Sequence, residues 1–229
     1  MEALMERVYA ANMDLFRRKM VLYTWGNVSE ADRSAGIMVI KPSGVPYESM
    51  RPELMVTVSL EDGRVVSGKL RPSSDAPTHL ALYRAFPDIG GVTHTHSTYA
   101  TAWAQAGRPL PCFGTTHADY FHGDVPVTRF LTDREVLKEY ELETGNVIAE
   151  TFRGKRASHT PGVLVRGHGP FTWGKDAVES VHHAVVLEEI ARIASISVSL
   201  LPELQPLPEA ILQKHYMRKH GPGAYYGQR

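Results

Sequence analysis

The spacing of the hydrophobic residues predicts that the chain begins with a helix. Leu4, Val8, Ala11 and Leu15 recur every three or four residues, which places their side chains on one face of an α-helix. The stretch Thr24-Trp25-Gly26-Asn27 interrupts this pattern, so the helix should end before it. We expect the apolar face of the helix to pack on the core.

A change in the hydrophobic pattern predicts strands after this helix. Ile37–Ile40 is a short apolar run, and Leu54–Leu60 alternates more loosely between apolar and polar residues. Asp62-Gly63 favours a hairpin turn, and Val65-Val66 follows it closely. We expect three strands in this part of the chain.

Helices and short strands alternate in the rest of the chain. Asp75 precedes Pro77 at the start of a periodic segment, which predicts Asp75 as the N-cap of a helix of about three turns. Thr132 and Glu135 have the spacing of a capping box, and Pro109–Arg129 should be irregular. The other expected elements are strands at Val92–His96 and Val163–Val165, and helices at Tyr99–Gln105, Asp176–Leu200 and Glu209–His220.

This order of elements indicates the fold class. Strands mixed with helices, with at least one hairpin, are typical of an α/β sandwich with a mixed sheet rather than a doubly wound parallel one. The 229 residues suit one generous domain or two small ones. We expect a single domain over residues 1–229.

Charge balance and cysteine content exclude several classes of protein. The 25 basic residues match the 25 acidic ones, and no basic cluster is long enough to follow a phosphate backbone. We therefore expect no nucleic-acid partner. Cys112 is the only cysteine, which rules out an intrachain disulfide and a cysteine-rich zinc cluster. A cytoplasmic location fits this composition best.

No membrane span or signal peptide is expected. The most apolar stretch, Val185–Leu201, contains Glu188, Glu189 and Arg192, which are too many charges for a segment inside a bilayer. The acidic residues of the first helix differ from the basic start and unbroken apolar stretch of a signal peptide. We expect no membrane partner.

Three histidines are candidate metal ligands. His94 and His96 are two residues apart in a predicted strand, so both imidazoles should leave the same face. A metal site and a histidine-bearing solvent face are about equally compatible with this pair alone. His168 lies between two glycines after the strand Val163–Val165, where there is room for a ligand. Three imidazoles would leave positions open for a substrate, as in catalytic zinc sites.

Two segments are candidate phosphate sites. Ser73 and Ser74 stand at a predicted helix start, where the positive end of the helix dipole favours an anion. In Lys41-Pro42-Ser43-Gly44, glycine would let the backbone approach a phosphate while lysine and serine donate to it. The sequence contains no Walker motif and no GxGxxG motif, which gives no support to a nucleotide cofactor.

Two further segments carry titratable side chains. Thr115–Tyr120 contains His117 and Asp119 in a predicted loop, where an acid/base residue and a polar turn are equally compatible with the pattern. Tyr225 and Tyr226 lie in a short C-terminal tail, and such tails fray unless they are docked.

Seven short motifs occur in an order that identifies a family. They are Thr24-Trp25-Gly26-Asn27-Val28-Ser29, Lys41-Pro42-Ser43-Gly44, Ser73-Ser74-Asp75, His94-Thr95-His96-Ser97, Gly114-Thr115-Thr116-His117-Ala118-Asp119, His168-Gly169-Pro170 and Tyr225-Tyr226-Gly227-Gln228. Together they resemble the class II aldolase and adducin family. The resemblance covers nearly the whole chain and implies a three-layer α/β/α sandwich with a central mixed, largely antiparallel sheet.

The resemblance also implies roles for individual residues. Family members are homotetramers whose sites lie between subunits, so Tyr226 would act on a neighbour's site. The implied roles are zinc binding by His94, His96 and His168 with Asp75 beside the ion, phosphate binding by Ser43, Gly44, Ser73 and Ser74, a place in the substrate pocket for Asn27 and Lys41, and acid/base catalysis by Asp119 and Tyr226.

The narrower likeness is to family members that convert L-ribulose 5-phosphate to D-xylulose 5-phosphate, in arabinose breakdown or from related sugar acids. The hydrogen on C4 of such a sugar is not adjacent to the C2 carbonyl, so its direct removal as a proton is unfavourable. Oxidation and reduction would need a nicotinamide site, for which the sequence has no motif. Retro-aldol cleavage of C3–C4 needs a Lewis acid, which zinc supplies. The resemblance therefore implies epimerisation by cleavage and re-addition.

Two other functions remain open. A related aldolase or sugar-phosphate dehydratase would use the same metal site, although Asp75 stands where aldolase members tend to carry glutamate. A non-catalytic, adducin-like domain would keep the fold without the metal, and the complete histidine set favours an enzyme. Three imidazoles also accept manganese, cobalt or iron.

Overall fold

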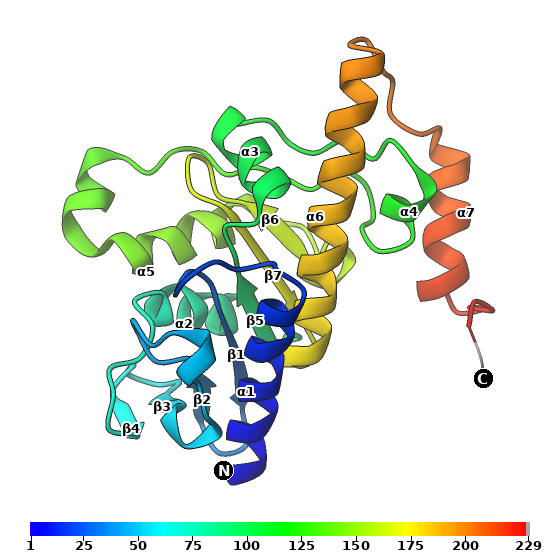
Figure 1. Cartoon of the computed structure of the whole chain (residues 1–229). Helices are drawn as coiled ribbons and strands as arrows, with labels where there is room; N and C mark the ends of the chain where they lie inside the picture. Colours follow the sequence, from blue (N-terminus) through cyan, green and yellow to red (C-terminus); the bar gives the residue numbers. More distant parts are fainter. Residues whose placement is uncertain (228–229) are drawn as a thin grey trace.

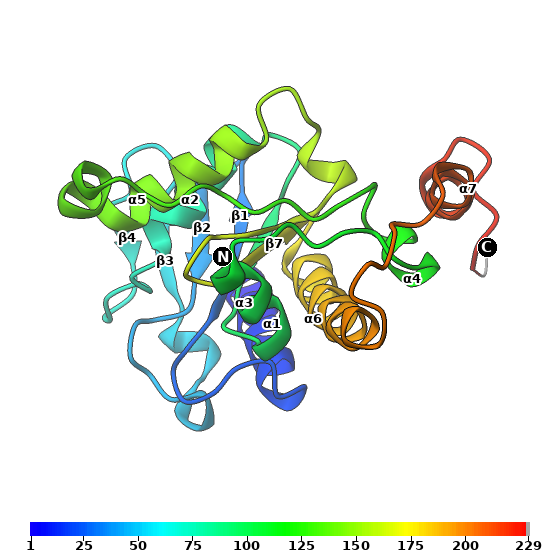
Figure 2. The same cartoon turned by 90° about the horizontal axis from the view of Figure 1, so that it is seen from above.

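The computed structural model describes residues 1–227, so Gln228 of the tail motif lies outside the described residues. The polypeptide forms three layers, with a seven-stranded sheet between two layers of helices (Figures 1 and 2). Each named strand pairs with its neighbours in antiparallel fashion. The expected α/β class and three-layer sandwich are confirmed.

The sheet has the strand order β4-β3-β2-β1-β5-β7-β6. Its central strand, β1, pairs with β5, which comes from a segment about sixty residues later in the sequence. The strands are β1 (Asn27–Asp32), β2 (Ile37–Ile40), β3 (Val56–Ser59), β4 (Val65–Ser67), β5 (Gly91–His94), β6 (Gly162–Leu164) and β7 (Pro170–Gly174).

Helices cover both faces of the sheet. On one face, α2 (Ala76–Ala85) and α5 (Asp133–Thr151) pack around a core that includes Leu82, Phe152 and Trp173. On the other face, α1 (Glu2–Arg17) and the long α6 (Ala177–Leu200) bury a second set of apolar side chains. Burial of apolar surface on both faces is the main force that stabilises such a sandwich.

The remaining helices lie around α6. The helix α3 (Thr98–Ala106) packs against α6, and the N–H groups of Tyr99 and Ala100 in its first turn donate to the carboxylate of Glu188 on α6. The short α4 (Thr115–Ala118) and the last helix α7 (Glu209–His220) pack together on the far side of α6 from α2 and α5 (Figure 2).

Most predicted elements are present, with five differences. The strands β1 and β7 were not predicted, and α4 interrupts the segment expected to be irregular. The strand β5 ends at His94, so His96 lies beyond it. The Asp75 side chain does not cap α2 although Asp75 occupies the N-cap position, because its carboxylate accepts a hydrogen bond from Asn27 instead.

No helix among the described residues has the length and apolar character needed to cross a membrane.

Two adjacent glycines allow α6 to start close to β5. A Cβ atom at Gly90 would overlap the carbonyl group of Lys175, and one at Gly91 would overlap that of Asp176. Both contacts are with backbone atoms, which cannot move aside as a flexible side chain can. The pair thus sets the distance between β5, which carries His94, and the first turn of α6.

We predict that Gly91→Ala destabilises the fold by about 3 kcal/mol or more, because overpacking against backbone is at the upper end of such effects. For a chain of this size, that corresponds to a decrease in Tm of roughly 6–12 °C, measurable by thermal unfolding. Gly114→Ala is the matched control, since a Cβ at Gly114 has no heavy atom within 4 Å. Equal Tm values for the two variants would contradict this account of the β5–α6 contact.

Candidate active site

Three histidines converge at one edge of the central sheet. His94 is the last residue of β5, His96 follows it by two residues, and His168 lies in the connection between β6 and β7. One potential ligand nitrogen from each ring lies within 4.8 Å of the corresponding nitrogens of the other two. This spacing would allow all three nitrogens to bind a single ion.

The backbone fixes the orientation of His94. Its Nδ1 lies 3.0 Å from the carbonyl oxygen of Pro170, and a carbonyl can only accept, so Nδ1 carries the proton. The lone pair of Nε2 is therefore available for a ligand. The ring also stacks on Phe171, with centroids 4.2 Å apart. The His94 side chain is held in the tautomer that metal binding requires.

The other two rings are in surroundings that favour the neutral imidazole. Burial lowers the pKa of His96, and the neighbouring His94 lowers it further. Burial and the proximity of His94 and His96 lower the pKa of His168 to about 4. Neutral rings at neutral pH have free lone pairs, which a divalent cation needs.

A carboxylate lies next to the histidines. Burial alone would raise the pKa of Asp75, but His94, His79 and a hydrogen bond from Asn27 outweigh it and keep the pKa below its ordinary value. The Nδ2 group of Asn27 donates to Asp75 Oδ2 at 2.6 Å and to Ser73 Oγ at 3.0 Å. Asp75 thus remains an anion beside the three rings, where it adds negative charge for a cation.

The predicted metal-binding and phosphate-binding residues share one cavity of about 410 Å³, a volume suited to a small ligand. Its lining includes Asn27, Lys41, Ser43, Gly44, Ser73, Ser74, Asp75, His94, His96 and His168. Segments far apart in the sequence therefore meet around one space, as the motifs led us to expect.

Lys41 is the buried cation of this cavity. Its side chain has carbonyl oxygens as partners, at 3.4 Å for Thr24 and 3.3 Å for Pro42, and its Nζ lies 5.0 Å from the centroid of the Tyr47 ring. Burial lowers the pKa of Lys41 to about 8, against the opposing effect of Asp75. At neutral pH the ammonium group is charged and has no carboxylate in hydrogen-bond contact among the described residues, which suits it to an anionic ligand.

Backbone hydrogen bonds join the two serine-containing loops. The Ser43 N–H donates to the carbonyl of Arg71, and the Ser73 N–H donates to that of Lys41. Gly44 adopts a φ of 68° with open space around its Cβ position. The two loops therefore form one wall of the cavity, where hydroxyl groups can face a phosphate.

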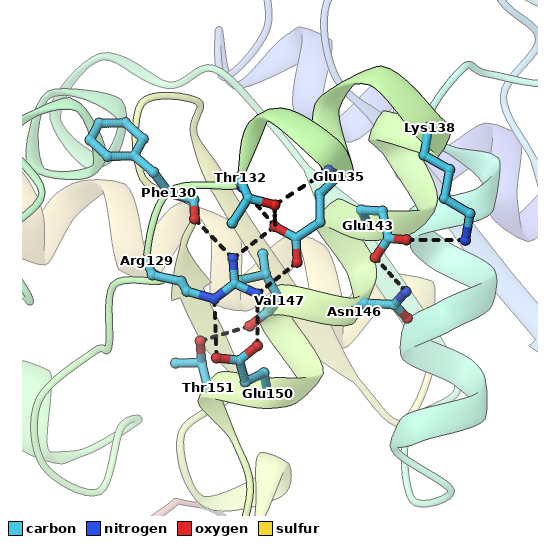
Figure 3. A network of polar contacts seen from close by, with 10 residues as sticks. All are labelled: Arg129, Phe130, Thr132, Glu135, Lys138, Glu143, Asn146, Val147, Glu150 and Thr151. Carbon is cyan, nitrogen blue, oxygen red and sulfur yellow. Dashed lines mark hydrogen bonds and ion pairs between the residues drawn. The ribbon is translucent and has the colours of Figure 1, made fainter.

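Two cavity residues, Tyr140 and Glu141, were missed in the sequence. They follow a bend in α5 at Glu139, whose φ of −145° and ψ of 73° are not helical. Figure 3 shows that Arg129 ties Glu135 before the bend to Glu150 after it, with contacts of 2.8 and 2.9 Å. This network holds the two parts of α5 together and places Tyr140 Oη 3.5 Å from His168 Nδ1.

The two predicted acid/base residues lie elsewhere in the chain. Asp119 directly follows α4, and Tyr226 lies beyond α7. Neither residue lines the histidine cavity, and α4 and α7 are separated from α2 and α5 by α6 (Figure 2). Within one chain, these two side chains are not brought to the histidines.

The donor set fits a divalent cation. Three imidazoles and a nearby carboxylate are the ligand types that zinc and related cations prefer. Asn27 Oδ1 is buried and has no hydrogen-bond partner among the described residues, so it can accept from a polar ligand in the same cavity. The cavity can therefore hold both a cation and an anionic, hydroxyl-bearing molecule.

Residues 6–195 match the model of the Class II Aldolase and Adducin N-terminal domain. The chain belongs to this family. Class II aldolases are typically metal-dependent, and the histidine cluster could bind a metal ion.

The chain aligns over its whole length with curated relatives. It is 58% identical over all 229 residues to proteins named L-ribulose-5-phosphate 4-epimerase UlaF from Salmonella paratyphi B and Salmonella typhi, with complete coverage of both chains. A solved L-fuculose 1-phosphate aldolase is 24% identical, with a TM-score of 0.80 over 94% of this chain and 95% of that one. The latter likeness supports the fold.

We expect the purified protein to contain about one divalent ion per chain, as three converging imidazoles imply. His96→Ala should weaken metal binding more than 100-fold, because even the loss of an outer-shell partner typically costs roughly 10–100-fold. Metal analysis after dialysis measures this loss. His159→Ala is the control, since His159 lies outside the cluster. Equal metal retention by both variants would contradict the assignment.

Proposed function

We propose that the protein is a zinc-dependent L-ribulose-5-phosphate 4-epimerase. The observation that carries this proposal is the cavity in which three converging histidines, Asp75 and the buried Lys41 meet. The full-length identity of 58% to proteins named as this epimerase supports the choice of substrate. Asp75, where aldolase members tend to carry glutamate, favours an epimerase over a related aldolase or dehydratase.

In this proposal the phosphate group occupies the Lys41 side of the cavity. The Lys41 ammonium would neutralise part of its charge, and Ser43, Gly44, Ser73 and Ser74 would surround its oxygens. The unpaired Asn27 Oδ1 would accept a hydrogen bond from a sugar hydroxyl. These contacts would leave the C2–C4 portion of the sugar beside the histidines.

The reaction has to break a carbon–carbon bond. Removal of the proton from the C4 hydroxyl lets the C3–C4 bond cleave, which releases glycolaldehyde phosphate and leaves the bonding electron pair on the three-carbon fragment. A cation bound by His94, His96 and His168 would act as the Lewis acid for that charge. Rotation of the aldehyde and re-formation of the bond invert C4, and a proton returns to the C4 oxygen.

Two groups on opposite sides of the sugar are needed for these proton transfers. We assign them to Asp119 and Tyr226, and the structure leaves both away from the cavity of their own chain. A homotetramer with sites between subunits would meet this requirement, because a neighbour's α4 and tail could cover the open side of the cavity. We also propose that residues 1–229 form one domain and that the protein acts in the cytoplasm.

Incubation with L-ribulose 5-phosphate tests the assignment directly. We expect D-xylulose 5-phosphate as the product, separated by chromatography and measured against both standards. Chelation of the metal should reduce the rate by several orders of magnitude, and added zinc should restore it. Dihydroxyacetone and glycolaldehyde phosphate as the main products would indicate an aldolase. A protein that alters no sugar phosphate and holds no metal would indicate a binding domain.

Mixing two inactive variants tests the shared site. Asp119→Asn should reduce kcat by roughly 10²–10⁴-fold, and His96→Ala should lose activity together with the metal. Random reassembly of equal amounts should restore about one quarter of the wild-type activity. One site in four then combines intact histidines from an Asp119→Asn chain with an intact Asp119 from a His96→Ala chain. The control mixes Asp119→Asn with a variant that carries both Asp119→Asn and His96→Ala, because no chain in that mixture supplies an intact Asp119. No recovery in mixed tetramers would place both halves in one chain.

A further inference from the structure

Arg218 on α7 forms two hydrogen bonds with Asp119. Its Nε donates to Oδ1 at 3.0 Å and its Nη2 donates to Oδ2 at 2.6 Å. This two-point contact fixes the plane of the carboxylate as well as its position. The Asp119 side chain is only 11% exposed, and that of Arg218 is 24% exposed, so water screens the pair less than at an open surface.

The same arginine holds the C-terminal tail. The centre of its guanidinium lies 4.8 Å from the centroid of the Tyr226 ring, a distance typical of a cation–π contact. Its carbonyl oxygen accepts from the N–H groups of Tyr225 at 3.0 Å and Tyr226 at 3.2 Å. The tail therefore turns back on α7 after Gly221 and docks on Arg218, instead of fraying.

We propose that Arg218 is a positioning residue that holds Asp119 and Tyr226 in a fixed relation to each other, so that a neighbouring cavity receives them as one unit. The inference rests on the proposed function, which gives these two residues their acid/base roles. Lys219 also approaches both groups: its Nζ lies 3.8 Å from Asp119 Oδ2, beyond hydrogen-bond distance, and 4.5 Å from the Tyr226 ring centroid.

The charges around Asp119 explain why an arginine is needed there. Burial alone would raise the pKa of Asp119, but hydrogen bonds from Arg218 and His215 and the charge of Lys219 outweigh burial and hold the pKa below its ordinary value. The His220 Nε2 lies 2.9 Å from the Asp119 carbonyl oxygen. On α6, the rings of His182 and His183 lie beside those of Tyr120 and Phe121, the two residues that follow Asp119. Loss of Arg218 would remove the largest of the opposing contributions, so the Asp119 pKa would rise.

The test compares Arg218→Ala and Arg218→Lys with the wild type in the interconversion of L-ribulose 5-phosphate and D-xylulose 5-phosphate. Arg192→Ala is the control, since Arg192 forms an exposed ion pair with Glu189 on α6. Metal content and oligomeric state are measured for each variant. Methylguanidinium is added to Arg218→Ala to replace the missing group, and kcat is followed as a function of pH.

We expect kcat of Arg218→Ala to fall at least about tenfold, as part of the roughly 10²–10⁴-fold contribution of acid/base residues, with KM and metal content within about twofold of the wild type. Methylguanidinium should restore part of the rate, and Arg218→Lys should lose less because it keeps the charge without the two-point contact. The acidic limb of the kcat profile should move to higher pH in Arg218→Ala.

An active Arg218→Ala variant with the wild-type kcat and pH profile would overturn the inference. So would a loss of activity that methylguanidinium does not relieve and that accompanies loss of assembly, because Arg218 would then have only a structural role. A wild-type protein that leaves both pentulose phosphates unchanged would instead contradict the proposed function.

Discussion

The site depends on the antiparallel pairing of three neighbouring strands. In the register of β1, β5 and β7, Asn27 stands opposite His94, and His94 stands opposite Phe171. Three side chains therefore lie in one line across the sheet. They are the amide of Asn27, which donates to Asp75, the imidazole of His94, and the ring of Phe171 on which that imidazole stacks. A shift of one residue in either pairing would turn these side chains to the opposite face.

The sequence predicts the helices well because their stability comes from periodic apolar faces. The apolar residues that predicted α1 are buried as expected, and the capping box of α5 and the bounds of α7 are also as expected. The central strand β1 was missed because it reads Asn-Val-Ser-Glu-Ala-Asp. Its polar residues Ser29 and Glu30 are buried because their side chains are paired, Ser29 with His79 and Tyr83, and Glu30 with Arg7 and the Ala177 N–H. Only tertiary structure supplies such partners.

The site was predictable where residue type carries the chemistry. The histidines and the serine-containing loops, which residue type alone indicated as candidate metal and phosphate sites, meet in one cavity. The local sequence predicted that the Asp75 side chain caps α2, but its carboxylate accepts a hydrogen bond from Asn27 instead of from the N-terminus of α2. Tyr140 and Glu141 could not be found from periodicity, because the bend at Glu139 alone turns them toward the cavity.

The surroundings of Lys41 couple ligand binding to protonation. With a pKa of about 8 in the free protein, a fraction of the chains carries a neutral amine at mildly alkaline pH. A dianion bound next to this group would favour the ammonium form, so its binding would take up a proton from the buffer. A sugar without a phosphate group would leave the buried ammonium with only carbonyl oxygens as hydrogen-bond partners. The cavity would therefore distinguish its ligands by their charge as well as by the shape of the carbon chain.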